Sequence, residues 1–265
     1  MPFARVYSTQ NTFIDAQIVS VEADLTKNTL QKFSVVGLPD KAVEESRDRV
    51  AAAIGNAGFT SPKGKNQKVV ISLAPADLKK EGPLFDLAIA LVYLLSAEEI
   101  SFDPEGKLFL GELGLDGELR PVKGVLALVQ KAAHEGFREV YVPSPNAREA
   151  ALVRGITVYG VHTLRELIRH LSPEPAREPS RTHTSLDKRV VPALGLTPSP
   201  QTVFQPTPSP TLIDLADIKG QESAKKGLEY AAAGGHNIAL YGPAGTGKTM
   251  LAKALGGILP DLSFE

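Results

Sequence analysis

The sequence predicts an α/β protein with a large first domain and the beginning of a second one. Three observations support this fold class. Short β-branched stretches alternate with amphipathic helical segments over residues 1–171, a proline-rich stretch covers residues 172–211, and a glycine-rich loop lies within residues 212–265. A chain of 265 residues can bury one substantial core and part of another.

The first domain opens with segments that carry β-branched residues and alternating polarity. We expect strands at three places: Ala16–Leu25, Lys32–Leu38 and Lys68–Ala74. Between the last two, the sequence predicts a helix that begins after Asp40 and closes at Gly58. An Asp side chain can accept from the free amides of a first helical turn, and Gly favours the backbone that ends a helix.

The rest of the first domain continues this alternation. Pro83 suits the first position of a second helix, because its missing N–H would have no partner there. Asp116-Gly117 lies between alternating segments and predicts a β-hairpin. After the hairpin, βα-like units extend to Leu171.

Residues 172–211 contain nine of the chain's twenty prolines and are expected to form a linker. Proline removes backbone donors, so this stretch is unsuited to helix or sheet interiors. One apolar island, Val190–Leu196, interrupts it and is a candidate for docking on a neighbouring surface.

Composition excludes several classes of function. Twenty-nine basic residues balance thirty acidic ones, so no overall field attracts nucleic acid or membranes. The chain has no Cys, and its five His are scattered, which argues against disulfides, thiolate chemistry and a zinc site. The first residues do not have the pattern of a signal peptide, and the longest apolar run is too short to span a bilayer. A cytoplasmic protein without membrane contact is expected.

A phosphate-binding (Walker A) motif lies near the carboxyl end. Every fixed position of G-x-x-x-x-G-K-[ST] is matched by Gly242, Pro243, Ala244, Gly245, Thr246, Gly247, Lys248 and Thr249. An apolar strand is expected before the loop, at Asn237–Gly242, and an amphipathic helix after it. Glycines let backbone N–H groups surround phosphate oxygens, Lys248 supplies a cation, and the Thr249 hydroxyl can bind Mg²⁺. The motif therefore predicts binding of ATP with Mg²⁺.

Hydrolysis needs more than this loop. An acidic residue at the end of a second strand must hold Mg²⁺ and water, and an arginine must stabilise the transition state. Neither is expected within the sixteen residues that follow Thr249. We therefore expect no catalytic residue and no hydrolysis from this chain.

The stretch Asp214–Pro260 resembles the magnesium-chelatase-like AAA+ ATPases of the ComM/YifB type. The resemblance continues upstream through "FSVVGLPDKAVEESRDRVAAAIGNAGF", "ISLAPADLKKEGPLFDLAIAL" and "FLGELGLDGELRPVKGVL". It implies a first domain of the ribosomal-S5-domain-2/Lon-protease type and a P-loop AAA+ αβα second domain that forms hexamers when complete. It further implies a nucleotide base close to "IKGQ", that is Ile218, Gly220 and Gln221.

The first domain also resembles the proteolytic domain of Lon, which uses a Ser–Lys dyad. The position that matches the serine is Leu84 in "KKEGPLFD", and the position that matches the lysine is Leu126 in "RPVKGVLALVQ". A leucine side chain can neither attack a carbonyl nor exchange a proton, so no peptidase activity is expected.

Three functions remain open. The resemblance favours a DNA-remodelling motor of the branch-migration or helicase type, active in natural transformation or recombination. The alternatives are the ATPase component of a magnesium-chelatase-like or protein-remodelling complex, and a non-enzymatic assembly or binding module. A weak candidate patch for DNA consists of Arg47, Arg49, Lys63, Lys65 and Lys68.

Overall fold

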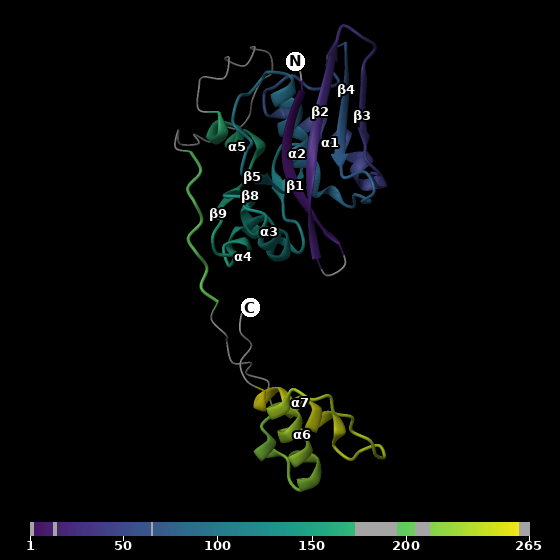
Figure 1. The fold of residues 1–265 in the computed structure, drawn as a ribbon, viewed down its shortest axis with the longest axis vertical. Helices are drawn as coiled ribbons and strands as arrows, with labels where there is room; N and C mark the ends of the chain where they lie inside the picture. Colours follow the sequence, from purple (N-terminus) through teal and green to yellow (C-terminus); the bar gives the residue numbers. More distant parts are fainter. Residues whose placement is uncertain (1–2, 13–14, 65, 173–194, 205–212, 260–265) are drawn as a thin grey trace. The chain divides into compact units, whose positions relative to one another are not determined.

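The computed structural model describes residues 3–12, 15–64, 66–172, 195–204 and 213–259. The chain forms two compact units, Met1–Thr202 and Val203–Glu265. In its described part, the first unit is built around a seven-stranded sheet flanked by helices (Figure 1). The predicted α/β class is therefore confirmed.

The sheet has the strand order β3-β4-β2-β1-β5-β8-β9. The pairs β1–β2 and β2–β4 are antiparallel, whereas β3–β4, β1–β5, β5–β8 and β8–β9 are parallel. The bounds are β1 Phe3–Thr12, β2 Asp15–Lys27, β3 Lys32–Val36, β4 Gln67–Ala74, β5 Lys107–Phe109, β8 Glu139–Pro143 and β9 Thr157–Val161. A separate hairpin pairs β6, Glu112–Leu113, with β7, Leu119–Arg120.

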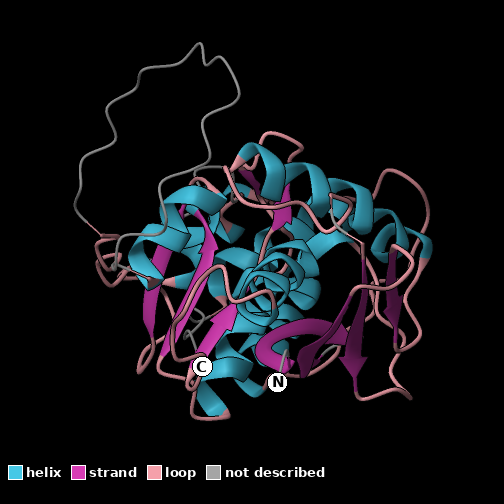
Figure 2. Ribbon diagram, turned by 90° about the horizontal axis from the view of Figure 1, so that it is seen from above, coloured by secondary structure: helices cyan, strands magenta, loops and turns pink. Residues whose placement is uncertain are grey.

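Helices cover both faces of this sheet (Figure 2). One buried cluster joins β1, β2 and β4 to α1 (Lys41–Asn56), α2 (Asp86–Ser96) and α5 (Leu164–Leu171). A second cluster, on the other face, joins β5, β8 and β9 to α3 (Val125–His134) and α4 (Ala147–Ala150). Each sheet face buries alternate residues of its strands, so the two clusters together form the layers of an αβα unit.

The local signals in this unit correspond to real elements. Asp40 caps α1, because its carboxylate accepts from the Val43 amide at 2.8 Å. Pro83 begins a 3₁₀ turn, Pro83–Phe85, that leads directly into α2. The predicted hairpin is β6–β7, and Gly117 adopts φ 87° in its turn.

The central strand β1 was not predicted. Three of its consecutive side chains, Ser8, Thr9 and Gln10, are polar, and yet all three are buried. Gln10 bonds backbone groups, but the hydroxyls of Ser8 and Thr9 have no hydrogen-bond partner in the described part of the chain. A polar sequence therefore occupies the middle of the sheet, where pairing with β2 and β5 on both sides holds it.

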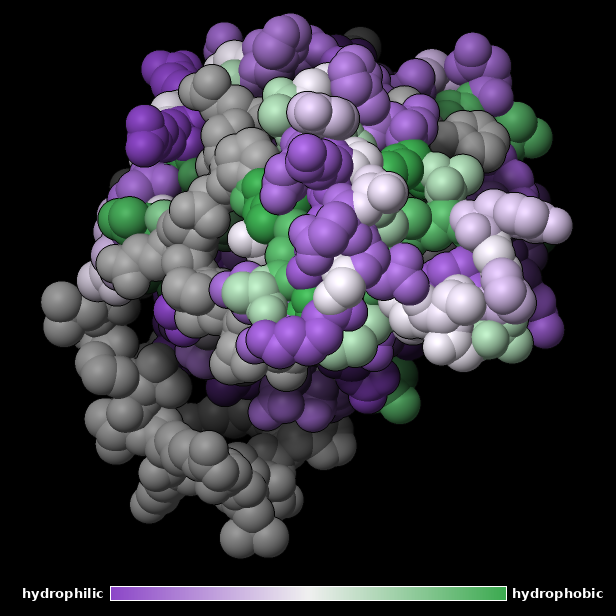
Figure 3. Space-filling model, turned by 90° about the horizontal axis from the view of Figure 1, so that it is seen from below, coloured by the Kyte–Doolittle hydropathy of each residue, from purple (hydrophilic) through white to green (hydrophobic). Residues whose placement is uncertain are grey.

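The second unit is small. Its described elements are a 3₁₀ turn, Leu215–Asp217, and two helices, α6 (Glu222–Gly234) and α7 (Lys248–Ile258). They share a core of four buried side chains: Ile218, Leu228, Leu251 and Ala254. Apolar side chains also stay exposed on this unit, among them Ile238, Met250 and Leu259. Figure 3 shows one face of the molecule, where apolar groups lie open among polar ones.

The strand expected at Asn237–Gly242 is not formed, and this expectation is corrected. These residues enter the glycine-rich loop without strand structure, and Tyr241 is fully exposed. A strand is stabilised by hydrogen bonds to a neighbour. Within the described residues, no other segment pairs with this one, so its apolar sequence lacks the sheet that would bury it.

A buried ion pair connects the helices on one face of the first unit. The Arg49 guanidinium on α1 donates to both carboxylate oxygens of Asp86 on α2, at 2.9 and 3.1 Å. The Leu113 amide of β6 donates to the same carboxylate at 3.2 Å. Asp86 is fully buried, and desolvation raises its pKa to about 6 although Arg49 opposes the shift.

We predict that Arg49→Met destabilises the first unit by about 3–5 kcal/mol, because it leaves a buried carboxylate without its counter-charge. Replacing both partners, as in Arg49→Met/Asp86→Leu, should cost less than the single change. Denaturant unfolding of the wild type and the two variants checks this order. An equal loss of unfolding free energy in the single and the double variant would contradict this prediction.

The raised pKa of Asp86 also predicts a pH dependence. The folded state holds the Asp86 proton more tightly than the unfolded state, so the contribution of this group to stability falls as pH rises from about 4 to about 6. Asp86→Asn removes the titration. The difference in unfolding free energy, Asp86→Asn minus wild type, should therefore increase as pH rises across this range. A difference that stays constant with pH would show that Asp86 does not titrate there.

Candidate nucleotide-binding site

The glycine-rich loop has the backbone that its sequence requires. Gly245 and Gly247 adopt φ 79° and 81°, in the left-handed region that only glycine occupies without strain. Gly247 is also the residue that precedes α7, so the loop runs directly into a helix N-terminus. A Cβ atom at either glycine would meet no atom within 4 Å, so the space above both is open.

Backbone donors of the loop are available to a ligand. Within the described part of the chain, no hydrogen-bond acceptor is found for the amides of Ala244, Gly245, Thr246 and Gly247. They adjoin the N-terminus of an eleven-residue helix, whose own first amides point the same way. Free amides together with a helix dipole favour an anion such as phosphate.

Lys248 lies folded back over the loop. Its ammonium donates to the Pro243 carbonyl at 2.5 Å and to the Thr246 hydroxyl at 3.4 Å. The Thr246 hydroxyl donates in turn to the Pro243 carbonyl at 3.0 Å. The lysine can leave these neutral acceptors for a phosphate, because a charge-assisted bond to an anion is the stronger one.

The "IKGQ" segment contacts the loop through one side chain. Gln221 donates from Nε2 to the Thr246 carbonyl at 3.4 Å and adopts φ 61°, which is unusual for a residue other than glycine. Ile218 belongs to the core that α7 shares, and Gly220 has φ 72°. The structure therefore brings this segment and the loop together.

The residues suit Mg²⁺ held through a nucleotide. Thr249 is exposed in the first turn of α7, one residue after the lysine. Its hydroxyl is a hard oxygen ligand of the kind that Mg²⁺ prefers when phosphate oxygens and water supply the rest. A metal bound here would neutralise phosphate charge.

The two positions that match the Lon dyad carry packed leucines. Leu84 is partly buried against both clusters of the first unit, and Leu126 is partly buried against the second. At the start of α3, Gly124 adopts φ 72°, and a Cβ atom there would lie 2.5 Å from the side-chain nitrogen Nδ2 of Asn11. Both positions therefore carry packed apolar side chains.

Hydrogen bonds hold the "KKEGP" loop in place. The Gln10 side chain donates from Nε2 to the Lys79 carbonyl at 2.7 Å, and its Oε1 accepts from the Glu81 backbone amide at 3.3 Å. Asp40 accepts from the Gly82 backbone amide at 3.1 Å with the oxygen that does not cap α1. The loop thus connects β1, α1 and α2.

The prediction that Arg49 belongs to a DNA-binding patch is wrong. Arg49 is committed to Asp86 and is not a free cation. Lys63 forms an ion pair with Asp48, and Arg47 donates to the Glu44 carbonyl while remaining exposed. Lys68 is exposed on β4, and Lys65 lies outside the described residues.

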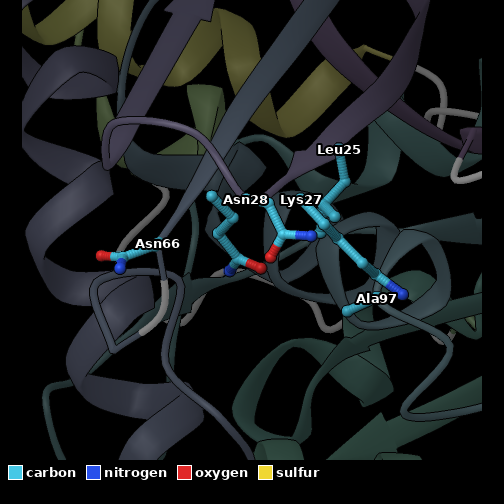
Figure 4. Close-up of a pocket in the computed structure, with 6 residues that line it drawn as sticks. Leu25, Lys27, Asn28, Asn66 and Ala97 are labelled. Atoms are coloured by element: carbon cyan, nitrogen blue, oxygen red, sulfur yellow. The ribbon is translucent and has the colours of Figure 1, made fainter.

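A pocket of about 380 Å³ lies in the first unit (Figure 4). Its lining is Leu25, Lys27, Asn28, Asn66, Gln67 and Ala97. In Figure 4 the Lys27 side chain extends toward Ala97, and its ammonium lies 3.9 Å from Glu98.

No α-helix in the described part of the chain combines the length and apolar character that crossing a bilayer requires.

Comparisons with known proteins match both units. Residues 21–146 match the family described as subunit ChlI of Mg-chelatase, and residues 214–265 match the family described as magnesium chelatase, subunit ChlI. The second match includes the glycine-rich loop and the "IKGQ" segment.

Relatives extend over nearly the whole chain. The competence protein ComM of Haemophilus influenzae is 37% identical over 264 residues, which are 99% of this chain and 48% of ComM. YifB of Salmonella typhimurium is 38% identical over 266 residues, 100% of this chain and 47% of YifB. The DNA repair protein RadA of Streptococcus pneumoniae is 33% identical over 105 residues, 40% of this chain and 24% of RadA.

The chain spans about half the length of ComM and YifB. Two family matches and similarity to both relatives over nearly the whole chain agree with the glycine-rich loop and the adjoining "IKGQ" segment. The chain belongs to the magnesium-chelatase-like ComM/YifB family.

Proposed function

We propose that this chain supplies the ATP-binding loop and the non-peptidase N-terminal domain of a DNA-remodelling ATPase. ATP would bind with Mg²⁺ at Gly242–Thr249, the base would lie near Ile218, Gly220 and Gln221, and the complete motor would be a cytoplasmic homo-hexamer. The names of two relatives, a competence protein and a DNA repair protein, support the DNA role.

One observation carries the nucleotide part of this proposal. Four consecutive loop amides have no acceptor within the described residues, and they adjoin Lys248 and the N-terminus of α7. The amides would bind phosphate oxygens, Lys248 would neutralise their charge, and Thr249 would orient the metal. Water activation and the charge-stabilising arginine are not assigned to any residue of this chain.

A second candidate is the ATPase component of a magnesium-chelatase-like complex, which the family descriptions favour. A third is a binding or assembly module, which the packed leucines at positions 84 and 126 favour for the first unit. ATPase activity that DNA stimulates in a protein of full family length would support the motor. Stimulation by a porphyrin and partner subunits would support the chelatase instead.

We predict that Mg·ATP stabilises the second unit and that Lys248→Ala abolishes the effect. At a ligand concentration one hundred times the Kd, a competent site gains about 2.7 kcal/mol. Titration calorimetry and thermal melts of the whole chain measure it.

Lys253→Gln is the matched control, because Lys253 is exposed on the same helix, five residues after Lys248. It should bind Mg·ATP like the wild type. If Lys248→Ala and the wild type bound Mg·ATP with equal affinity, the glycine-rich loop would not be the nucleotide-binding site.

We predict that Asp48→Asn strengthens DNA binding and that Lys68→Gln weakens it. Lys63 is partly neutralised by Asp48, so removing the carboxylate exposes one more cation. Losing Lys68 should reduce the slope of log affinity against log salt by about one. Filter binding across a salt series measures both, and unchanged slopes would remove this patch from the proposal.

A further inference from the structure

A residue with a strained backbone lies directly before α6, beside the glycine-rich loop. Gln221 adopts φ 61° and ψ 34°, in the left-handed region that residues other than glycine rarely occupy. Strain of this kind persists only where surrounding contacts hold it, and it is concentrated at functional sites. Gln221 is therefore a candidate for a role beyond the start of a helix.

Contacts on both sides hold Gln221 in this conformation. Ile218, three residues earlier, is buried in the core that α6 and α7 share, and its amide donates to the Leu215 carbonyl at 3.2 Å. The Gln221 carbonyl accepts from the Lys225 amide at 3.0 Å, as α6 begins. The Gln221 side chain does not cap the free amides of its own helix, so its amide group is left for another partner.

That partner is the backbone of the glycine-rich loop. Gln221 donates from Nε2 to the Thr246 carbonyl at 3.4 Å. Thr246 stands between Gly245 and Gly247, and a Cβ atom at either glycine would meet nothing within 4 Å. Glycine has the greatest backbone freedom of all residues. The Gln221 bond therefore restrains a carbonyl whose two neighbouring glycines are free of packing.

The direction of this carbonyl determines where the next amide points. In a planar trans peptide, the C=O of Thr246 and the N–H of Gly247 point in opposite directions. With the carbonyl held by Gln221, the Gly247 amide points away from Gln221, and it has no acceptor within the described part of the chain. It adjoins the N-terminus of α7, which favours an anion. Rotation of this peptide unit by half a turn would present the carbonyl oxygen to the anion instead.

We propose that Gln221 is a positioning residue of the phosphate-binding loop, which acts on a bound phosphate through the Thr246–Gly247 peptide unit. This inference rests on the proposed nucleotide site and adds a role to it. A base close to the "IKGQ" segment is compatible with this role, but Gln221 then contributes to affinity through the phosphates. The observed bond to the loop backbone carries the distinction.

The test compares a ligand that has a base with one that has none. Titration calorimetry of the whole chain measures the binding of Mg·ATP and of Mg·tripolyphosphate. Gln221→Gly removes the amide group and suits φ 61° without strain, so the second unit keeps its backbone. Gln221→Ala removes the same group and keeps the strain. Glu98→Ala is the matched control, because Glu98 is exposed and adopts φ 60° in the first unit.

Gln221→Gly and Gln221→Ala should weaken the binding of both ligands by the same factor. We expect about two- to tenfold, the range that one net hydrogen bond gives. Glu98→Ala should bind both ligands like the wild type. In nuclear magnetic resonance spectra, the Gly247 amide proton should shift downfield when tripolyphosphate binds to the wild type, and it should shift less in Gln221→Gly.

Three results would overturn this inference while the nucleotide site stands. If Gln221→Gly bound tripolyphosphate like the wild type and only ATP more weakly, Gln221 would act on the base. If only Gln221→Ala lost affinity, backbone strain would be the cause. If Gln221→Gly bound both ligands like the wild type while Lys248→Ala lost binding, the Gln221 bond would have no role. A wild type that bound neither ligand would reject the proposed nucleotide site itself, and this inference with it.

Discussion

The carboxylate of Asp86 is the constraint around which the first unit is organised. It is fully buried, it receives both arms of the Arg49 guanidinium, and it accepts the Leu113 amide. These bonds join α1, α2 and the β6–β7 hairpin at one point. Separating the two helices would leave a buried carboxylate without its counter-charge, which is costly. It also explains why Arg49 belongs to the core and not to a surface patch.

The loop that precedes α2 is held in place from several directions. Gln10 and Asp40 bind its backbone, and Pro83 starts the 3₁₀ turn that leads into α2. Leu84 packs against both buried clusters of the first unit, and Leu126 packs against the second. Each of these contacts stabilises the packing of helices on the sheet.

The second unit shows how a loop can be preorganised while its sheet is not. The left-handed glycines and the N-terminus of α7 need only local backbone geometry and a core of four side chains. The segment that enters the loop needs neighbours on both sides, and the described residues provide none. The exposed Tyr241 and Ile238 follow from this missing pairing.

Local signals in the sequence determined the α/β class, the cap of α1 at Asp40, the turn at Asp116-Gly117 and the position of the phosphate-binding loop. These features depend on residues that are close in sequence, such as a side chain that bonds an amide three positions away. Only the tertiary structure decided that the polar β1 lies mid-sheet, that Arg49 pairs with Asp86, and that Pro198 forms a bridge with Tyr159 of β9. Each of these depends on partners that are distant in sequence, and burial and hydrogen bonding to such partners override local preference.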